Sequence, residues 1–327
     1  MRAWQVDRAG RPADVLSLGE RDVPAPGPGR LRLRVLAAAV GMPDAMMCSQ
    51  SYAFAPPTPF VPGQEVCGIV DAVGEGVSIP IGTRIMGVTD FFDGHGGLAE
   101  HCLMGEGTAF EVPPSMSDEI AASFRIGYST AWIGLVRRAS TQPGEHVLVL
   151  GAAGGSGAAA IEVARALGAS VIAVVSGAEK AAFARRCGAD HVLDRTEGPL
   201  APRVRDLTGG RGVDVVYDPV GGALAADAMR SLASGGRFLA VGFASGSWAT
   251  VDTAAMVRAN WSFVGVYAGA IGRSDNEVDQ ARLLDAVASG SIRPEVREVA
   301  FADAARVVQE IADGAAIGKT VVRVAHA

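Results

Sequence analysis

Residues 147–157 read VLVLGAAGGSG, an apolar run that breaks into glycine and alanine, and the chain continues as AAAIEVARALG. The apolar run is typical of a buried strand and the continuation is typical of a helix, so the glycines fall in the turn between them. Glycines let such a turn fold tightly and approach a ligand closely, while the N–H groups at the start of the helix face an anion. The stretch therefore predicts a binding site for the pyrophosphate of a dinucleotide, formed by Gly151, Gly154, Gly155, Ser156 and Gly157.

The alternation of strands and helices continues after this turn. Short apolar runs such as SVIAVV, HVLD, VDVVYD and RFLAVG alternate with helical stretches such as EKAAFARRCG and GALAADAMRSLASG. Parallel strands joined by helices form right-handed crossovers, and the helices then cover both faces of the sheet. We therefore expect an α/β domain with a doubly wound parallel sheet from about residue 140.

The N-terminal part of the chain has a different pattern. Residues 1–122 are rich in turn residues, as in VPAPGPGR and FAPPTPFVPG, and contain short β-like runs such as LRLRVLAAAV. This pattern predicts an irregular, mostly β domain. After residue 260 follow the apolar run WSFVGVYAG, two helical segments and a closing strand KTVVRV. A chain of 327 residues is long enough for two domains.

Composition narrows the class of protein. Apolar residues make up 49% of the chain, charged residues make up 20%, and the formal net charge is -6. Such a chain is neither disordered nor suited to a polyanion, so we expect no nucleic-acid partner. The chain has no long uninterrupted apolar run and its N-terminus, MRAWQVDRAG, has no apolar signal core. We therefore expect no membrane partner and a cytoplasmic location. Four well-separated cysteines without a CxxC pair predict reduced thiols.

Several of these segments resemble the zinc-independent quinone oxidoreductase branch of the medium-chain dehydrogenase/reductase superfamily. The likeness is carried by residues 147–194, by VPGQEVCGIVDAVGEGV and YSTAWIGL before them, and by VDVVYDPVGG, AVGFASG and IGKTVVRV after them. It implies a GroES-like, mostly β catalytic domain formed by residues 1–122 and 262–327, with a Rossmann dinucleotide-binding domain at 123–261 inserted between. It also implies a homodimer, and a cofactor and substrate that meet in the cleft between the domains.

The superfamily also includes zinc-dependent alcohol dehydrogenases, so the residues at the metal-ligand positions decide whether a zinc site is expected here. In the zinc branch one ligand is a cysteine three residues before an aspartate, and here Gly41 stands three residues before Asp44. Another ligand is the histidine of a GHE triplet, and here GQE places Gln64 at that position. The four-cysteine structural zinc lobe has no counterpart, and the glycines around His95 indicate a loop before a strand. We therefore predict no metal site.

Hydride transfer without a Lewis acid needs an acceptor that is already electrophilic, such as a quinone or a C=C bond conjugated to a carbonyl. We therefore expect an NADPH-dependent reductase with a small-molecule electrophilic acceptor. Tyr52 falls where related enoyl-thioester reductases and many quinone reductases carry a tyrosine, so the resemblance implies it as the proton donor. A phenol can act as a general acid. The alternative is that Tyr52 lines the site without acid function and that solvent supplies the proton.

Further cofactor contacts are implied by position in the family. They are Thr130 of YSTAW, Phe243, Ala244 and Ser245 of GFASG, and Val266 and Tyr267 of GVYAG. Ligands of open α/β sheets bind beyond the carboxyl ends of the strands, where the last two segments are expected. The alternative for each residue is packing or turn formation alone.

The residues at the end of the second strand of the α/β domain indicate whether the domain binds NAD(H) or NADP(H). NAD-binding proteins tend to place a carboxylate there for the ribose 2′-hydroxyl, and that carboxylate would repel a 2′-phosphate. Here VIAVVSGAEK offers Ser176 and then Lys180, and Arg195 follows HVLD where the family often has a tyrosine beside the same phosphate. These residues predict NADPH. Glu179 is the complication, because it would meet a ribose hydroxyl if the loop turned differently.

Two departures from the family pattern leave other functions open. Quinone reductases of this kind often have asparagine at the Gly41 position and arginine at the Cys48 position. Here GMPDAMMCSQ presents Met42, Met46 and Met47, which fill a core or adapt to an irregular apolar ligand. Among enzymes, the alternative is an enoyl-thioester reductase. From a different class, the alternative is a catalytically silent NADPH-binding structural or sensory protein.

Overall fold

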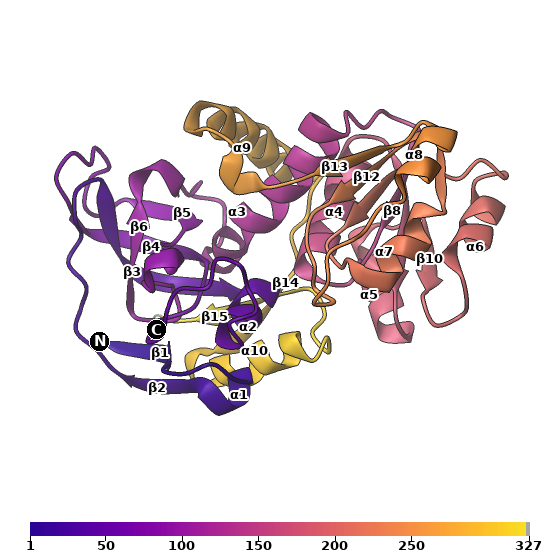
Figure 1. Cartoon of the computed structure of the whole chain (residues 1–327). Helices are drawn as coiled ribbons and strands as arrows, with labels where there is room; N and C mark the ends of the chain where they lie inside the picture. The colour runs from indigo at the N-terminus through magenta and orange to yellow at the C-terminus, as the bar shows by residue number, and fades with distance from the viewer. Residues whose placement is uncertain (325–327) are drawn as a thin grey trace. The chain divides into compact units, whose positions relative to one another are not determined.

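The computed structural model describes residues 1–324 and divides the chain into two compact units (Figure 1). The first unit comprises Met1–Ile126 and the described part of Glu295–Ala327, and the second comprises Gly127–Pro294. The end of the predicted C-terminal part, 325–327, lies outside the described residues. In the part of the chain that is described, no helix is long and apolar enough to cross a membrane.

A six-stranded sheet is the centre of the second unit. Its strands are, in chain order, β8 (His146–Val149), β9 (Ser170–Val175), β10 (His191–Asp194), β11 (Val213–Asp218), β12 (Leu232–Ala240) and β13 (Ser262–Gly265). Neighbours follow the order β10-β9-β8-β11-β12-β13, and all pairs are parallel. Counted from β8 as the first strand, this is the strand order of a Rossmann fold, so the predicted doubly wound sheet is confirmed.

Helices alternate with these strands (Figure 1). They are α3 (Asp118–Trp132), which begins in the first unit, the π-helical segment η3 (Ile133–Arg138), α4 (Gly155–Ala166), α5 (Ala178–Cys187), α6 (Leu200–Leu207), α7 (Gly222–Met229), α8 (Thr253–Ala259), the short 3-10 segment η4 (Ala268–Ala270) and α9 (Arg273–Ala288). Residues 171–175 of β9 are all buried, as expected for a strand whose two faces are covered. Burial on both faces explains why the run VIAVV is apolar at every position, without the alternation of apolar and polar residues seen in a half-exposed strand.

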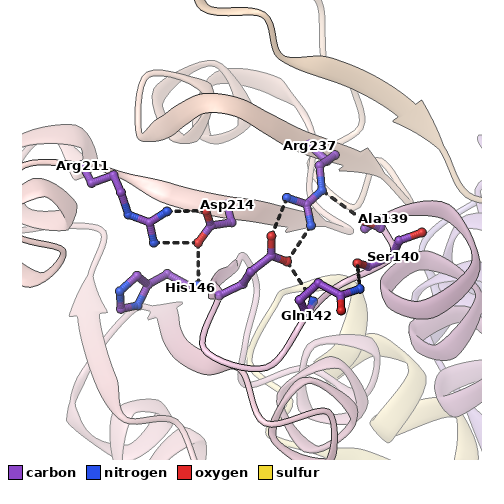
Figure 2. A network of polar contacts seen from close by, with 8 residues as sticks. Ala139, Ser140, Gln142, His146, Arg211, Asp214 and Arg237 are labelled. Atoms are coloured by element: carbon purple, nitrogen blue, oxygen red, sulfur yellow. Dashed lines mark hydrogen bonds and ion pairs between the residues drawn. The ribbon is translucent and has the colours of Figure 1, made fainter.

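Ion pairs and hydrogen bonds join the strands near the amino end of this sheet (Figure 2). Glu145, just before β8, accepts hydrogen bonds of 2.9 and 2.6 Å from the Arg237 guanidinium of β12. Asp214 of β11 pairs with Arg211 at 2.6 Å and accepts a hydrogen bond of 2.8 Å from the backbone N–H of His146. These contacts fasten three strands together at the end of the sheet that lies opposite the glycine turn.

The first unit is built on a seven-stranded, mainly antiparallel sheet. Its strands are β3 (Arg30–Val40), β4 (Glu65–Val73), β5 (Arg84–Val88), β6 (His101–Gly105), β7 (Ala109–Glu111), β14 (Val296–Ala300) and β15 (Lys319–Arg323), while β1 (Arg2–Val6) and β2 (Leu16–Glu20) form a separate two-stranded sheet. The short helical segments are α1 (Pro12–Val15), α2 (Met42–Cys48), η1 (Phe91–Asp93), η2 (Glu106–Thr108), η5 (Phe301–Asp303) and α10 (Ala304–Ala312). β15 pairs antiparallel with β3, so the end of the chain completes a sheet that the first third begins.

The unit boundaries differ from those predicted. The first part of the first unit ends at Ile126 instead of residue 122, and the chain returns to this unit at Glu295 instead of residue 262. The assignment of residues 262–294 to the catalytic domain is therefore wrong. β13 is a strand of the parallel sheet because it pairs with β12, and α9 is held to η3 by an ion pair of 2.6 Å between Arg137 and Asp279. Both interactions join distant stretches of chain, so the local sequence carries no sign of them.

Candidate functional site

The glycine turn follows β8 and closes tightly on itself. Gly151 has φ +56°, in the left-handed region, and a Cβ there would lie 2.9 Å from Cγ2 of Val220. A Cβ on Gly157 would lie 2.4 Å from the carbonyl oxygen of Gly151, which is closer than real contacts allow. Gly154 is the N-cap of α4 and supplies no side-chain acceptor, so the first N–H groups of the helix are left to donate. A turn of this shape fits a pyrophosphate.

Gly155 and Ser156 are the first two residues of α4. Ser156 is half-buried, and its Oγ lies 3.0 Å from the phenolic oxygen of Tyr217, near the end of β11. The sequence predicts Ser156 in the turn but gives no indication of Tyr217. The two residues come from separate βαβ units, and no spacing rule indicates that their side chains meet.

The residues predicted to read a 2′-phosphate lie at the ends of two neighbouring strands. Val175 of β9 pairs with Asp194 of β10, so Ser176 and Arg195 are the next residues on adjacent strands. The N–H of Arg195 donates to the carbonyl oxygen of Val175 at 2.9 Å. Ser176 and Lys180 are half-buried, whereas Arg195 is exposed. The structure thus gathers a hydroxyl and a cationic side chain at one corner, with Lys180 in the first turn of α5.

Asp194 fixes the geometry of this corner and was not singled out from the sequence. Its carboxylate accepts hydrogen bonds of 2.9 and 2.7 Å from the N–H and hydroxyl of Thr196, and one of 2.7 Å from the N–H of Gly177. These hydrogen bonds, those from Thr196 first, lower the pKa of Asp194 to about 2. The spacing Asp-x-Thr is the signal that could have revealed this Asx turn. Glu179, the alternative ribose contact, is exposed.

The predicted loop 243–245 follows β12 and packs on the loop that follows β11. The N–H groups of Ala244 and Ser245 donate to the carbonyl oxygens of Pro219 and Val220 at 3.1 and 2.9 Å. Phe243 is half-buried, and the two residues after it are exposed. Because these two N–H groups already bind the protein, the loop is left with its side chains and its remaining backbone groups for a cofactor.

Asp218, the last residue of β11, shapes the neighbouring loop and was also missed. It is fully buried, and its Oδ1 accepts hydrogen bonds of 2.8 Å from the N–H groups of both Val220 and Gly221. Burial raises the pKa of Asp218, against the effect of these hydrogen bonds. The carboxyl group thereby fixes the loop whose Val220 side chain packs beside Gly151.

The remaining contacts predicted in this unit lie beyond β13 and on α3. Val266 is buried and donates its N–H to the carbonyl oxygen of Ala240 at 3.0 Å, whereas Tyr267 is 53% exposed. On α3, a Cβ at Gly127 would lie 3.7 Å from the carbonyl oxygen of Gly155.

Thr130 shares a helix face with the two glycines on either side of it. A Cβ at Gly134 would lie 3.6 Å from Cγ1 of Val266. Residues three and four apart lie on one face of a helix, so Thr130 follows Gly127 and precedes Gly134 on that face. Thr130 is half-buried. The structure therefore places it along the line from the glycine turn to the end of β13, and its contact with a cofactor stays a prediction.

Tyr52 belongs to the first unit, in the loop that follows α2. It is half-buried against the core of that unit, and its ring meets the ring of Phe54 edge-on, with 5.7 Å between the centroids. The ring therefore has a defined environment. That the Tyr52 hydroxyl donates a proton stays a prediction.

Asp44 occupies a buried position in the first unit, three residues after the metal-ligand position of the zinc branch. It is 2% exposed, and its carboxylate accepts hydrogen bonds of 2.8 Å from the N–H groups of both Gly41 and Gly63. Burial raises the pKa of Asp44 to about 6, whereas the two hydrogen bonds and the charge of Lys319 lower it. The aspartate thus ties the start of α2 to the loop before β4.

An ion pair lies next to this carboxyl group. Glu65 pairs with Lys319 at 2.5 Å and accepts a hydrogen bond of 2.8 Å from the N–H of Ile126. A Cβ on Gly41 would lie 3.7 Å from the Lys319 ammonium nitrogen. The Lys319 ammonium therefore lies beside the position where the zinc branch has its cysteine.

The residues at this position do not fit a catalytic zinc. Gly41 has no side-chain donor, and Gln64 offers an amide where the zinc branch has an imidazole. Gln64 is buried, and its Nε2 has no hydrogen-bond partner within residues 1–324. Over the same residues, no three His, Cys, Asp or Glu side chains are grouped as metal ligands would be. A zinc site usually needs three such ligands.

Comparison with known proteins gives relatives along most of the chain. Quinone oxidoreductase-like protein 2 of Rattus norvegicus is 37% identical over 245 residues, which cover 74% of this chain and 69% of that protein. A mycobacterial protein solved in complex with NADPH is 34% identical, with a TM-score of 0.91 over 99% of this chain and 100% of that one. The Escherichia coli quinone oxidoreductase, also solved with NADPH, is 26% identical, with a TM-score of 0.89 over the same shares.

Two family models match the two kinds of domain. The alcohol dehydrogenase GroES-like domain matches residues 27–114, and the zinc-binding dehydrogenase model matches residues 155–286. The fold and the glycine turn together define a medium-chain dehydrogenase/reductase. Within that superfamily the chain belongs to the quinone oxidoreductase family, as its sequence motifs indicated.

Proposed function

We propose that this chain is a metal-free, NADPH-dependent reductase of quinones or α,β-unsaturated carbonyl compounds. The observation that carries the proposal is the loss of the metal donors in a chain that keeps the dinucleotide turn. Gly41 and Gln64 replace the ligands of the zinc branch, and the Lys319 ammonium stands beside Gly41. Because the chain lacks the ligands for a Lewis acid that would activate an alcohol or a simple carbonyl, an acceptor that is itself electrophilic suits it best.

The choice of NADPH is supported by two observations. The mycobacterial and Escherichia coli relatives were solved with NADPH. In this chain Ser176, Lys180 and Arg195 follow β9 and β10 at the corner where a dinucleotide carries its 2′-phosphate. A phosphate accepts strong, charge-assisted hydrogen bonds from such groups.

The residues of the chain would bind and orient the cofactor and protonate the acceptor. When bound, NADPH supplies a hydride to the acceptor. The N–H groups of the glycine turn would hold the pyrophosphate, and Thr130 and Val266 would orient the nicotinamide end. Tyr52 donates the proton that completes the two-electron reduction of the acceptor.

The experiment that tests the function is a substrate panel on the purified chain. The loss of NADPH absorbance is measured with quinones, enals, enones and enoyl thioesters, with NADH as the alternative cofactor, and with and without a chelator. We expect turnover of quinones or enones with NADPH, unchanged by the chelator. In the same assay Tyr52→Phe lowers enone turnover about 100-fold, the low end for general acid catalysis, while NADPH binding is kept.

Each other outcome would change a particular part of the proposal. Turnover of enoyl thioesters alone would make the chain an enoyl-thioester reductase, and NADPH binding without turnover of any substrate would make it a silent binding protein. Zinc near one ion per chain, together with loss of activity in chelator, would overturn the metal-free part. An unchanged rate in Tyr52→Phe would assign protonation to solvent.

A further inference from the structure

A buried tyrosine is hydrogen-bonded to the only hydroxyl of the glycine turn. Tyr217 of β11 has no exposed surface, and its phenolic oxygen lies 3.0 Å from Oγ of Ser156. Ser156 is half-buried and is the second residue of α4. One side of the Ser156 hydroxyl therefore faces a buried phenol, while the residue itself reaches the surface of the turn.

The direction of this hydrogen bond follows from the burial of Tyr217. Within residues 1–324, the Tyr217 hydroxyl has no other hydrogen-bond partner. If Ser156 donated the hydrogen, the phenolic hydrogen would be buried without an acceptor, at a cost of about 1–3 kcal/mol. Burial also raises the pKa of Tyr217, so the phenol keeps its hydrogen at neutral pH. Tyr217 is therefore the donor and Ser156 the acceptor.

The hydrogen of Ser156 is then free to donate elsewhere. A serine in a helix can donate to a carbonyl oxygen one turn back, but over residues 1–324 no backbone group binds the Ser156 hydroxyl. The adjoining N–H groups of the first turn of α4 receive no bond from the side chain of the N-cap, which is Gly154. The Ser156 hydroxyl thus joins the N–H donors of the helix start as a donor to an anion.

We propose that Tyr217 is a positioning residue that fixes the Ser156 hydroxyl as a hydrogen-bond donor to the pyrophosphate of the dinucleotide. The inference rests on the proposed function, because that function supplies the dinucleotide. It adds a side-chain donor to a turn that otherwise binds through its backbone. Without the phenol, the serine hydroxyl would rotate among its three staggered positions and turn toward a backbone carbonyl for part of the time.

The test is a double-mutant cycle read by ligand binding to the apoprotein. Ser156→Ala, Tyr217→Phe and the double variant are titrated with NADPH and with 2′-AMP, which carries the 2′-phosphate but no pyrophosphate. Ser156→Ala should weaken NADPH binding at least about tenfold, the lower end for a hydrogen bond to a charged group. Tyr217→Phe should weaken it about threefold to tenfold, and should add nothing once Ser156 is alanine. The dissociation constant for 2′-AMP should not change in any variant.

Tyr128→Phe is the matched control. Tyr128 is another buried tyrosine of the second unit, and its hydroxyl donates to Glu162 at 3.1 Å instead of to the turn. Its replacement should lower the melting temperature and leave NADPH affinity intact. Melting curves of all variants check that each is folded.

Three results would overturn the inference. They are unchanged NADPH binding in Ser156→Ala, a Tyr217→Phe effect that persists in full when Ser156 is alanine, and an equal loss of 2′-AMP binding. The first of these is informative even if Tyr217→Phe does not fold. A wild-type chain that binds no NADPH would instead contradict the proposed function, so the two failures are distinguishable.

Discussion

Asp44 is a single carboxyl group on which burial and hydrogen bonding act in opposite directions. Full burial favours the protonated form, whereas the N–H groups of Gly41 and Gly63 and the charge of Lys319 favour the ionised form. Burial prevails and raises the pKa of Asp44 to about 6. An unfolded aspartate titrates near pH 4, so between about pH 4 and pH 6 the folded chain holds a proton that the unfolded chain has lost. The stability from this proton is present below pH 4 and is lost as the pH rises through 6.

Asp44→Asn should remove this dependence, because an amide does not titrate. We expect the free energy of unfolding of the wild type, relative to the variant, to fall by about 1–3 kcal/mol from pH 4 to pH 6 and then to stay level. Urea denaturation over a pH series measures the difference. Asp194→Asn is the control, because hydrogen bonds lower the pKa of Asp194 to about 2. The free energy of unfolding of the wild type relative to this variant should therefore change only below about pH 4. If the free energy of unfolding of the wild type relative to Asp44→Asn did not change between pH 4 and pH 6, the Asp44 carboxyl would be ionised over that whole range.

Local requirements make a residue predictable, and long-range contacts do not. Gly151 and Gly157 could be recognised because the turn between a strand and a helix sets the spacing of its glycines. Tyr217 and Lys319 could not, because their partners Ser156 and Glu65 come from distant parts of the chain. Asp194 falls between the two, since its Asx turn is local but its bond to Gly177 is not.

At the scale of the element, the start of α4 depends on the absence of a side chain at Gly157. A Cβ there would lie 2.4 Å from the carbonyl oxygen of Gly151 and 2.6 Å from Cα of Ala152, and both neighbours are backbone atoms that cannot rotate away. Gly157→Ala should therefore destabilise the protein by about 1–3 kcal/mol, the usual cost of overpacking. Chemical denaturation of the two chains measures the loss.

Gly265→Ala is the matched control for that substitution. Gly265 ends β13 in the same unit, and a Cβ there would meet nothing within 4 Å. Alanine costs less backbone entropy than glycine in a strand, so this variant should be as stable as the wild type or slightly more so. If both variants were equally stable, the close approach of α4 to the turn would not restrict residue 157.

The elements of the second unit differ in how far their sequence reveals them. The runs VLVL and VIAVV are strands that the sequence predicts, because burial on both faces leaves them apolar throughout. β13 has only four residues, which are exposed or half-buried, and its place in the sheet comes from pairing with β12. The sequence therefore predicts the start of another domain at residue 262, where the structure has a strand of the same sheet.

At the scale of the whole molecule, β13 leaves one edge of the six-stranded sheet unpaired within residues 1–324. The N–H of Val266 points inward, to the carbonyl oxygen of Ala240. Alternate residues of a strand direct their N–H groups to opposite sides, so those of Phe263 and Gly265 point outward. Such an edge is a template for pairing with another strand unless the protein covers it.

We propose that the chain covers this edge by forming a homodimer in which β13 of one protomer pairs with β13 of its partner about a twofold axis. Gly265→Pro should dissociate the dimer, because proline removes an outward N–H and leaves the inward bonds to β12 in place. Gly265→Ala keeps that N–H and should remain dimeric. Light scattering at micromolar concentration should give a mass near twice the 33.5 kDa of one chain for the wild type and Gly265→Ala, and near one chain for Gly265→Pro. A wild-type mass of one chain would contradict the dimer, and a dimeric Gly265→Pro would place its interface away from β13.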